Sequence, residues 1–412
     1  MTERTLSRVE FVALMAGLGC INAAAIDVML PALPNMGDWF GVANANDRSL
    51  VLTAFLLGLG LPQLVFGPLI DRFGRRVPLL IGVALYAVAA LLAPLAPSFG
   101  VLLALRFVQG MGSAAVSVAS QSTVRDLYSG RAMAQIMSMI MSVFMIVPII
   151  APNVGQVILL TAPWQGIFFF MGAVGATFGA WAYLRLAETL APANRRPLTV
   201  ASVTQGFALV VGNRLALFYG LAGIFLFGAV LGFVNTAQQI YVGIYGLGAL
   251  FPLAFGVGPV FFAIAFLLNS RLVSRFGMRR LSHGAMLIYI AITGAWLAFA
   301  LAGVMPLWLF LAFLAGATLM QGFAWGNVGS LSMEPLGEVA GTASSVFGML
   351  STVGAAILGY FVAQAFDGTT VPVIGAYFIF GLLIIGCFLI AERGRLLHPH
   401  TPDGAAPFVP LP

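Results

Sequence analysis

The sequence is poor in the residues on which soluble proteins and metalloproteins depend. It has no lysine among its 19 basic residues, only two cysteines and three histidines, and only 8% of its residues are charged. Soluble globular chains carry about 25% charged residues, so that class is excluded. Cys20 and Cys387 lie inside apolar runs, which excludes a disulfide framework. The histidines, His283, His398 and His400, are too scattered for a metal or catalytic cluster, and we expect neither a metal nor an organic cofactor.

The residues that are present are mainly apolar, at 61% of the chain. They form twelve runs of the ~20 residues needed to cross ~30 Å of hydrocarbon, and none shows the alternation of a membrane β-barrel. The sequence therefore predicts an all-α membrane protein with twelve transmembrane helices. We place these spans at 9–30, 49–70, 77–96, 99–123, 133–160, 164–186, 213–239, 247–269, 281–303, 306–330, 340–365 and 371–391.

The arginines follow membrane topology. Of the 19, 17 fall at the termini or in the connections after even-numbered spans, which places both termini in the cytoplasm, with a bacterial inner membrane as the expected location. The net charge of +6 then reflects topology, and we expect lipid rather than nucleic acid as the surrounding partner.

Two halves of six spans each are indicated by a polar connection and by weak internal repeats. Gly67 to Gly74 is echoed from Ser270 to Gly277, and Gln109-Gly110 is echoed by Gln321-Gly322. Such repetition is typical of transporters with pseudo-symmetric halves. The predicted units are an N-terminal bundle (1–190), a linker (191–212), a C-terminal bundle (213–395) and a tail (396–412).

The connection between spans two and three carries a distinctive charge pattern. It holds Gly67, Asp71, Arg72, Gly74, Arg75 and Arg76 in ten residues. The positive-inside rule explains the arginines of an ordinary turn, but neither Asp71 nor the two glycines. This pattern resembles the signature loop of the major facilitator superfamily of secondary transporters, which implies two six-helix bundles that alternate in access.

Two ionisable residues stand deep within predicted spans, Asp27 and Arg106. A charge there costs ~2.5–3.5 kcal/mol on insertion scales unless it faces water or a partner, so such residues are functional candidates. Helical rise places both in the outer part of the membrane, where they could be neighbours. We favour a titrating role for Asp27 over a fixed ion pair that pins spans one and four together.

Further motifs resemble the Bcr/CflA branch of the 12-helix drug:H⁺ antiporters. The resemblance rests on Asp27 with Pro31-Ala32-Leu33-Pro34, Arg106 with Gln109-Gly110, Thr123-Val124-Arg125-Asp126, and Gly341-Thr342-Ala343-Ser344-Ser345. It implies proton coupling at Arg106 and a conformational latch in which Asp71 meets the start of span eleven. In that latch a loop arginine pairs with Asp126, and these contacts exist only while the cytoplasmic side is closed.

Span five departs from the antiporter signature of this branch. Ala151-Pro152 stands in place of Gly-Pro, and Gly155-Gln156 in place of Gly-Gly. Pro148, Pro152 and Gly155 are still expected to kink the helix and to allow close packing. A kink of the kind common in membrane helices is the equal alternative, and export is less firmly implied.

Polar and methionine-rich helix faces supply candidates for substrate binding. Span four carries a stripe through Arg106, Gly110, Ser113, Ser117 and Gln121, which lines a cavity or packs between helices. Span five presents methionines at intervals of four, which suits either an adaptable pocket or gap filling, the commoner use. Packing between helices is the equal alternative for the polar residues of span seven. The candidates are Gln109, Met111, Ser113, Met141, Phe144, Met145, Asn235, Gln238, Gln239, Gln321, Trp325 and Asn327.

The sequence thus predicts a monomeric, proton-coupled exporter of small amphipathic drugs, with the proton as the only coupling ion. A proton symporter for nutrient or metabolite uptake is the alternative on the same fold. A membrane-embedded enzyme or receptor would need a catalytic constellation or an extramembrane domain, and the short loops and two deep charges offer neither.

Overall fold

The computed structural model describes residues 6–191, 195 and 207–397. Within these ranges the regular structure is helical, and twelve helical spans are long and apolar enough to cross a membrane. The expected all-α fold is confirmed. The tail from residue 398 and most of the predicted linker lie outside the described residues, whereas residues 207–212 at the end of that linker are helical.

The N-terminal half contains six spans, two of which are broken at prolines. Pro31 and Pro34 lack the N–H that would continue span one, and Pro62 interrupts span two. The spans are α1 (Arg8–Asp27) with η1 (Leu30–Ala32) and α2 (Leu33–Trp39); η2 (Ala45–Ser49) with α3 (Leu50–Gly60) and α4 (Gln63–Phe73); α5 (Arg76–Leu92) with η3 (Ala93–Leu95); α6 (Phe99–Leu127); α7 (Gly130–Thr161); and α8 (Gln165–Arg185).

The C-terminal half repeats this plan. Its spans are α10 (Arg214–Gln238) with the π turn η5 (Gln239–Ile244); η6 (Gly248–Leu250) with α11 (Phe251–Phe255) and α12 (Val257–Phe276); α13 (Met278–Leu301); α14 (Leu307–Met333) with η7 (Glu334–Val339); α15 (Ala340–Gln364); and α16 (Val371–Ala391). All twelve predicted spans are present. Two predicted ends need correction: span one runs on to Trp39 because its prolines redirect the chain without ending the helical path, and span eight runs seven residues further, to Phe276, where Gly277 adopts φ +80°.

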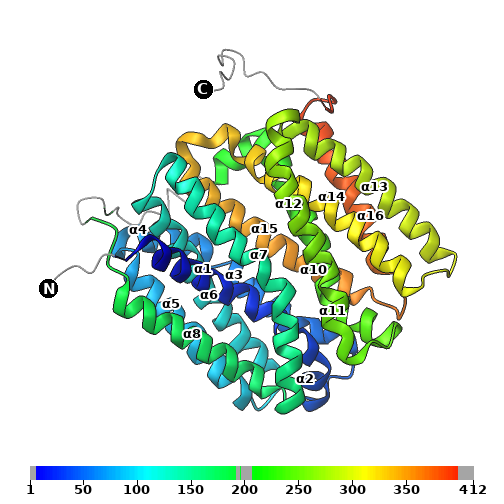
Figure 1. Cartoon of the computed structure of the whole chain (residues 1–412), viewed down its shortest axis with the longest axis horizontal. Helices are drawn as coiled ribbons and strands as arrows, with labels where there is room; N and C mark the ends of the chain where they lie inside the picture. Colours follow the sequence, from blue (N-terminus) through cyan, green and yellow to red (C-terminus); the bar gives the residue numbers. More distant parts are fainter. Residues whose placement is uncertain (1–5, 192–194, 196–206, 398–412) are drawn as a thin grey trace.

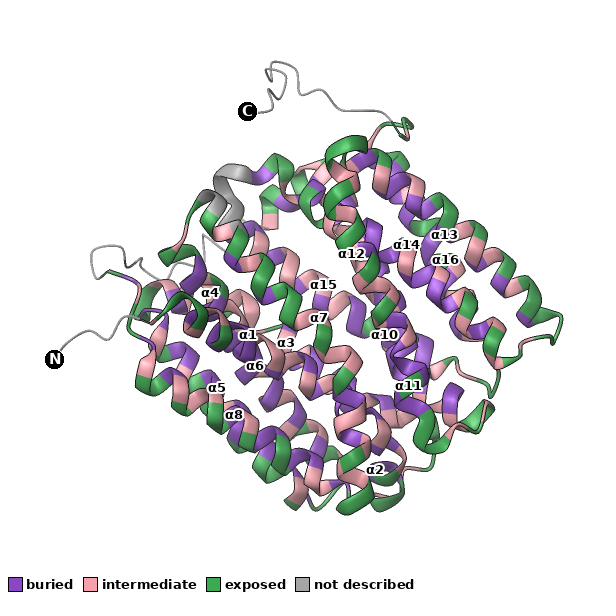
Figure 2. Ribbon diagram, in the orientation of Figure 1, coloured by how far each residue is buried: buried purple, intermediate pink, exposed green. Residues whose placement is uncertain are grey.

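The molecule has two ends that differ in charge. We call the end that carries the connections after even-numbered spans the arginine-rich face, and the opposite end, which holds α2, η2 and η6, the distal face. The start of α1 and the end of α16 both lie at the arginine-rich face, and the N- and C-terminal halves lie side by side (Figure 1). Each span carries both buried and exposed residues, which fits helices that pack on one side and face outward on another (Figure 2).

Glycines allow the closest helix contacts within the N-terminal half. A Cβ on Gly58 of α3 would lie 2.0 Å from the Phe107 carbonyl oxygen, and one on Gly110 of α6 would lie 2.1 Å from the Phe55 carbonyl oxygen. The two backbones therefore interlock at positions where only glycine fits. This contact fixes α6, and with it Arg106, against α3.

The two halves meet along two different seams. Along the first, α3 and α4 pack on α15, with Gly60 against Thr352 and Val353, and Gly67 against Ser345. Along the second, α7 faces α11 and α12, and the α7 and α12 ribbons diverge toward the arginine-rich face (Figure 1). The first seam is the more closely packed of the two.

Candidate functional site

A cavity of about 530 Å³ lies between the two halves. It extends from Asp27, Phe255 and Tyr377 toward the arginine-rich face, where Gln121 and Val124 line it. Its wall is formed by nine spans: one, two, four, five, seven, eight, ten, eleven and twelve. Its polar lining residues are Asn22, Asp27, Gln63, Ser117, Ser120, Gln121, Thr318, Gln321, Thr352 and Tyr377.

Asp27 is the last residue of α1, where the helix ends ahead of Pro31. Only 6% of the residue is exposed, and that exposure is toward the cavity it lines. In the part of the chain that the structure describes, its carboxyl group takes part in no hydrogen bond or ion pair. An unpaired carboxylate in such a place is costly, so a proton or a cationic ligand would stabilise it.

Arg106 is fully buried in α6, beside the cavity wall but not in it. Its Nη2 donates to the Ala25 carbonyl oxygen at 2.8 Å, its Nη1 to Gln109 Oε1 at 2.5 Å and its Nε to the Val51 carbonyl oxygen at 3.3 Å. The Phe55 ring lies 4.6 Å from the guanidinium carbon. The fixed ion pair with Asp27, which was the alternative to a titrating role, is not among the described contacts, because Arg106 donates instead to two backbone carbonyls and an amide.

The polar stripe of α6 divides into two parts. Toward the distal end, Gly110 and Ser113 pack against neighbouring helices, and Gln109, three residues from Arg106, is held by its guanidinium. Toward the arginine-rich end, Ser117 and Gln121 line the cavity. Both interpretations of the stripe thus apply, each to one part, because α3 covers only the distal part of this face.

The methionine face of α7 lines the cavity. Met137, Met141 and Met145 contribute to its wall, together with Phe144 and Pro148. Pro152 lies one turn further, and Gly155 meets the end of α1, where an added Cβ would lie 1.9 Å from the Val28 carbonyl oxygen. Gly155 therefore packs closely, as predicted, and it does so against Val28, the residue that follows Asp27.

Several substrate candidates lie away from the cavity. Met111, Ser113 and Gln109 of α6 are not among its lining residues, and neither are Asn235 and Gln238 of α10. Asn327 is also outside, because its amide donates to Asn269 Oδ1 and to the Phe323 carbonyl oxygen. Gln239 joins the distal contacts described next. Of the far-wall candidates, Gln321 and Trp325 do line the cavity.

A cluster of amides closes the distal face between the two halves. Asn46 Nδ2 donates to the carbonyl oxygens of Phe366 at 2.9 Å and Gln364 at 3.2 Å, and Asn46 Oδ1 accepts from Gln239 Nε2 at 2.7 Å. Gln364 Nε2 in turn donates to Asp47 Oδ1 at 3.0 Å. We call this set the distal clasp; it joins the two halves at the distal face, away from the Gln121 end of the cavity.

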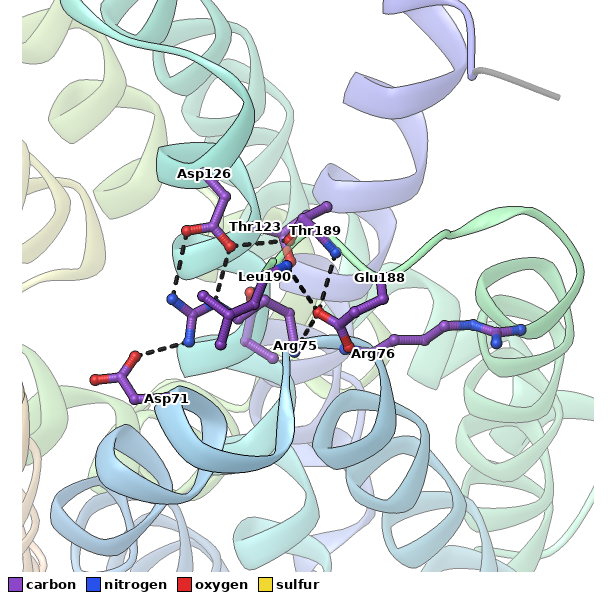
Figure 3. Close-up of polar contacts among 9 residues, drawn as sticks. Asp71, Arg75, Arg76, Thr123, Asp126, Glu188, Thr189 and Leu190 are labelled. Atoms are coloured by element: carbon purple, nitrogen blue, oxygen red, sulfur yellow. Dashed lines mark hydrogen bonds and ion pairs between the residues drawn. The ribbon is translucent and has the colours of Figure 1, made fainter. Parts of the chain in front are cut away.

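The loop between α4 and α5 forms a charge cluster inside the N-terminal half. Arg75 binds Asp71 at 2.7 Å and Asp126 at 2.9 Å, and Glu188 accepts the backbone N–H groups of Arg75 and Arg76 (Figure 3). Partial burial alone would lower the pKa of Arg75, but its bonds to Asp126 and Asp71 raise it above the ordinary value. Arg75 is thus the loop arginine that meets Asp126.

This cluster does not reach span eleven through Asp71 in the described contacts. Across the seam, Gly67 of α4 packs against Ser345, and the side chains of residues 337–342 lie outside the description. The Arg75–Asp126 contact is also present while the cavity extends toward the arginine-rich face, contrary to the expectation that it forms only when that side is closed. The physical reason is that both partners belong to the same half. The latch role of Gly67, Asp71, Arg72, Gly74, Arg75, Arg76 and Asp126 stays a prediction.

The C-terminal half carries a corresponding cluster that sequence reasoning did not find. Arg279 binds Glu334 at 2.8 Å and Glu392 at 2.7 Å, and Tyr219 also donates to Glu392. Burial would raise the pKa of Glu392, yet the bonds from Arg279 and Tyr219 lower it below the ordinary value. The weak echo of Gly67–Gly74 at 270–277 pointed to this place in the chain. Sequence reasoning also missed Asn22, which lines the cavity. Its position as the one amide within the apolar helix α1 could have identified it.

Comparisons with known proteins agree with this geometry. The Major Facilitator Superfamily model matches residues 15–359. This chain belongs to the major facilitator superfamily. It is 31% identical over 368 residues to a bicyclomycin resistance protein homolog of Haemophilus influenzae, covering 88% of this chain and 91% of that protein. It is 27% identical to a chloramphenicol resistance protein of Pseudomonas aeruginosa, covering 92% and 90% of the two chains.

The fold is shared with solved transporters of this superfamily. A crystal structure of a D-xylose-proton symporter superposes with a TM-score of 0.74 at 16% identity, covering 95% of this chain and 99% of that one. The superfamily and the fold make this chain a multi-pass membrane transporter rather than an enzyme, with two pseudo-symmetric six-helix bundles.

Proposed function

We propose that this superfamily member exports small amphipathic drugs in exchange for protons, by alternating access of the cavity. The observation that carries the proposal is Asp27, an unpaired carboxyl group that lines a largely apolar cavity between the two halves. The resistance proteins among its relatives support a drug as the substrate.

The arrangement suits exchange of a proton for a substrate. With the cavity facing the side that we assign to the cytoplasm, loss of the proton leaves a carboxylate whose burial favours binding of a substrate in its neighbourhood. With the cavity facing outward, proton binding at Asp27 removes that charge and lowers the affinity of the cavity for the substrate. Because ionised Asp27 favours the substrate and protonated Asp27 favours its release, a proton gradient can drive export.

Arg106 supports this chemistry without facing the cavity. Its hydrogen bond to the Ala25 carbonyl oxygen ties α6 to the last turn of α1, two residues before Asp27. We therefore assign Arg106 to proton coupling as a residue that positions Asp27 through the end of α1.

The second candidate function differs from the first in the direction of transport, which would be uptake rather than export. Span five lacks the full antiporter signature, and one of the solved structures that share the fold is a proton symporter, so uptake of a metabolite is the alternative. Deletion of the gene would raise drug sensitivity if the protein exports, and would abolish growth on one nutrient if it imports.

The decisive experiment compares Asp27→Asn with the wild type in inside-out membrane vesicles that are energised with a proton gradient. We expect proton-driven accumulation of drug to be lost at normal expression. The matched control is Asp367→Asn, because Asp367 is exposed on a distal loop and bonded only to Thr369. Undiminished proton-driven accumulation by Asp27→Asn would refute the proposal.

A further inference from the structure

We propose that one face of α14 is a subsite for an aromatic ring that carries an N–H or O–H group, so that the cavity selects its ligands by their hydrogen-bond donors as well as by charge. The face consists of Thr318, Gln321 and Trp325, which all line the cavity. The inference rests on the proposed function in one respect, that the cavity holds the transported molecule. It assigns polar recognition to the C-terminal half, whereas Asp27 belongs to the N-terminal half.

Helix periodicity brings these three side chains to the same side of α14. Residues three or four positions apart are neighbours on the surface of a helix, and positions 318, 321 and 325 follow this spacing. The three residues lie within one unbroken helix, Leu307–Met333. They therefore form a strip on a single rigid element of the cavity wall.

Gln321 has one end of its amide bound and the other end unbound. Its Nε2 donates to the Tyr289 hydroxyl oxygen at 3.4 Å, and the Tyr289 ring is stacked on Tyr377 with 6.2 Å between centroids. Tyr289 is fully buried and does not line the cavity, so this bond occupies the amide nitrogen on the protein side. Among the described residues no donor reaches Gln321 Oε1, although this atom is buried. A buried amide oxygen without a hydrogen bond is costly, so a donor from a ligand would stabilise it.

Thr318 supplies a second acceptor one turn earlier. Its hydroxyl group donates to the Leu314 carbonyl oxygen at 2.8 Å. A hydroxyl group has a single hydrogen, whereas its oxygen can also accept. Because the hydrogen is used within the helix, Thr318 offers the cavity an acceptor and no donor. Both polar groups of the strip thus favour a ligand that brings N–H or O–H groups.

Trp325 supplies an aromatic surface next to these acceptors. Its ring meets Phe227 of α10 at 5.4 Å and Phe262 of α12 at 5.7 Å between centroids, edge to face in both cases. Both phenylalanines also line the cavity. Aromatic rings attract one another at centroid separations of about 4.5–7 Å, so a flat ligand ring would be held by the same cluster.

These features select an aromatic amine or a phenol as the ligand. Its ring would lie against Trp325, and its N–H or O–H group would donate to Gln321 Oε1. A positive charge on the same molecule would be attracted by ionised Asp27, which lines the same cavity. Charge and donor are then recognised by different halves, so an aromatic cation whose nitrogens are fully alkylated keeps the first interaction and loses the second.

The test compares two dyes that differ in their donors. Rhodamine 123 and tetramethylrhodamine methyl ester share a positive charge and a xanthylium ring system, but only the amino groups of rhodamine 123 carry N–H. Their Kd values for the purified full-length protein in detergent are measured by fluorescence anisotropy. In Gln321→Met, which keeps an unbranched side chain and removes the amide oxygen, we expect the Kd of rhodamine 123 to rise about tenfold, the loss of one hydrogen bond, and the Kd of the methylated dye to stay unchanged. The matched control is Gln121→Met, because Gln121 lines the same cavity but is exposed, and we expect it to change neither Kd.

The outcomes separate recognition of a donor from a general effect on the cavity. Equal changes for the two dyes in Gln321→Met, or no saturable binding of rhodamine 123 to the wild type, would overturn the proposal. Tyr289→Phe is the second variant, since it removes the hydroxyl group that holds the amide nitrogen and keeps Gln321. We expect a smaller loss, again for rhodamine 123 alone, and an unchanged ratio of the two Kd values would contradict the assigned orientation of the amide. Binding in detergent needs no proton gradient, so these results stand whether or not Asp27→Asn abolishes export in vesicles.

Discussion

The contact of Gly155 with the end of α1 gives a sharp prediction about coupling between α7 and Asp27. In Gly155→Ala, the new Cβ would lie 1.9 Å from the Val28 carbonyl oxygen and 2.9 Å from the carbonyl carbon. These are backbone atoms, so no side-chain rotation can relieve the overlap. To restore a separation of 3.0 Å, α7 and the end of α1 would have to move apart by at least 1.1 Å.

The cost follows from this displacement. Overpacking of a close-packed contact typically costs about 1–3 kcal/mol, and here it also moves the residue next to Asp27. We expect Gly155→Ala to lower the thermal stability of the purified protein and to reduce transport more than its expression. Stability is measured by thermal unfolding in detergent, and transport by proton-driven drug accumulation in vesicles.

The matched control is Gly386→Ala in α16, where an added Cβ meets no atom within 4 Å. Because both changes replace a helical glycine by alanine, they share the same helix propensity gain of ~1 kcal/mol. Only the steric contact differs. If Gly155→Ala were as stable and as active as Gly386→Ala, the inferred coupling of α7 to the end of α1 would be refuted.

Three further predictions address other parts of the molecule. Asn46→Ala removes three hydrogen bonds of the distal clasp and should shift the conformational equilibrium by about 1–3 kcal/mol toward opening of the distal face, seen as longer distances between spin labels placed on the two halves there; unchanged distances would argue against the clasp. Arg106→Gln should lower folded yield more than Arg125→Gln, an exposed arginine of the same helix, because it removes the donor to the buried Ala25 carbonyl at the end of α1, at a cost of about 1–3 kcal/mol, and size-exclusion profiles would show the loss. Since the pKa of Glu392 is lowered in the folded protein, its stabilising contribution is present above the ordinary glutamate value of ~4.3 and is lost as the pH falls below it; Glu392→Gln should therefore reduce stability at neutral pH and flatten its fall in acid, and an unchanged acid profile would contradict this assignment.

The fold could be predicted from the sequence because the membrane imposes a simple length requirement on each apolar run. Helix boundaries were harder to predict where prolines redirect a helix, as at Pro31 and Pro62, because the apolar pattern continues across the break. The end of α12 also escaped prediction, because the helix continues past residue 269 through a more polar segment as far as Phe276 and ends where Gly277 adopts a positive φ.

The candidate site could be predicted from the sequence only in part. Asp27 stood out because a charge within hydrocarbon is rare, and the methionines of α7 because of their spacing. Helix periodicity could not tell which polar face meets the cavity: Gln321 does, whereas Gln239 lies in a π turn that directs it to Asn46. The distal clasp depends on residues more than 190 positions apart in the chain, a pairing that local patterns do not contain.

The placement of Arg75 and Arg279 bears on how the protein would respond to ionic strength. Among the described side chains, each ion pair joins two residues of the same half, whereas the hydrogen bonds between the halves are donated by side-chain amides and are accompanied by close glycine packing. Screening by added salt weakens exposed pairs of opposite charge far more than it weakens hydrogen bonds from amide donors. Raising the salt concentration should thus loosen the individual bundles at their arginine-rich ends while leaving the preference between inward and outward orientation nearly constant.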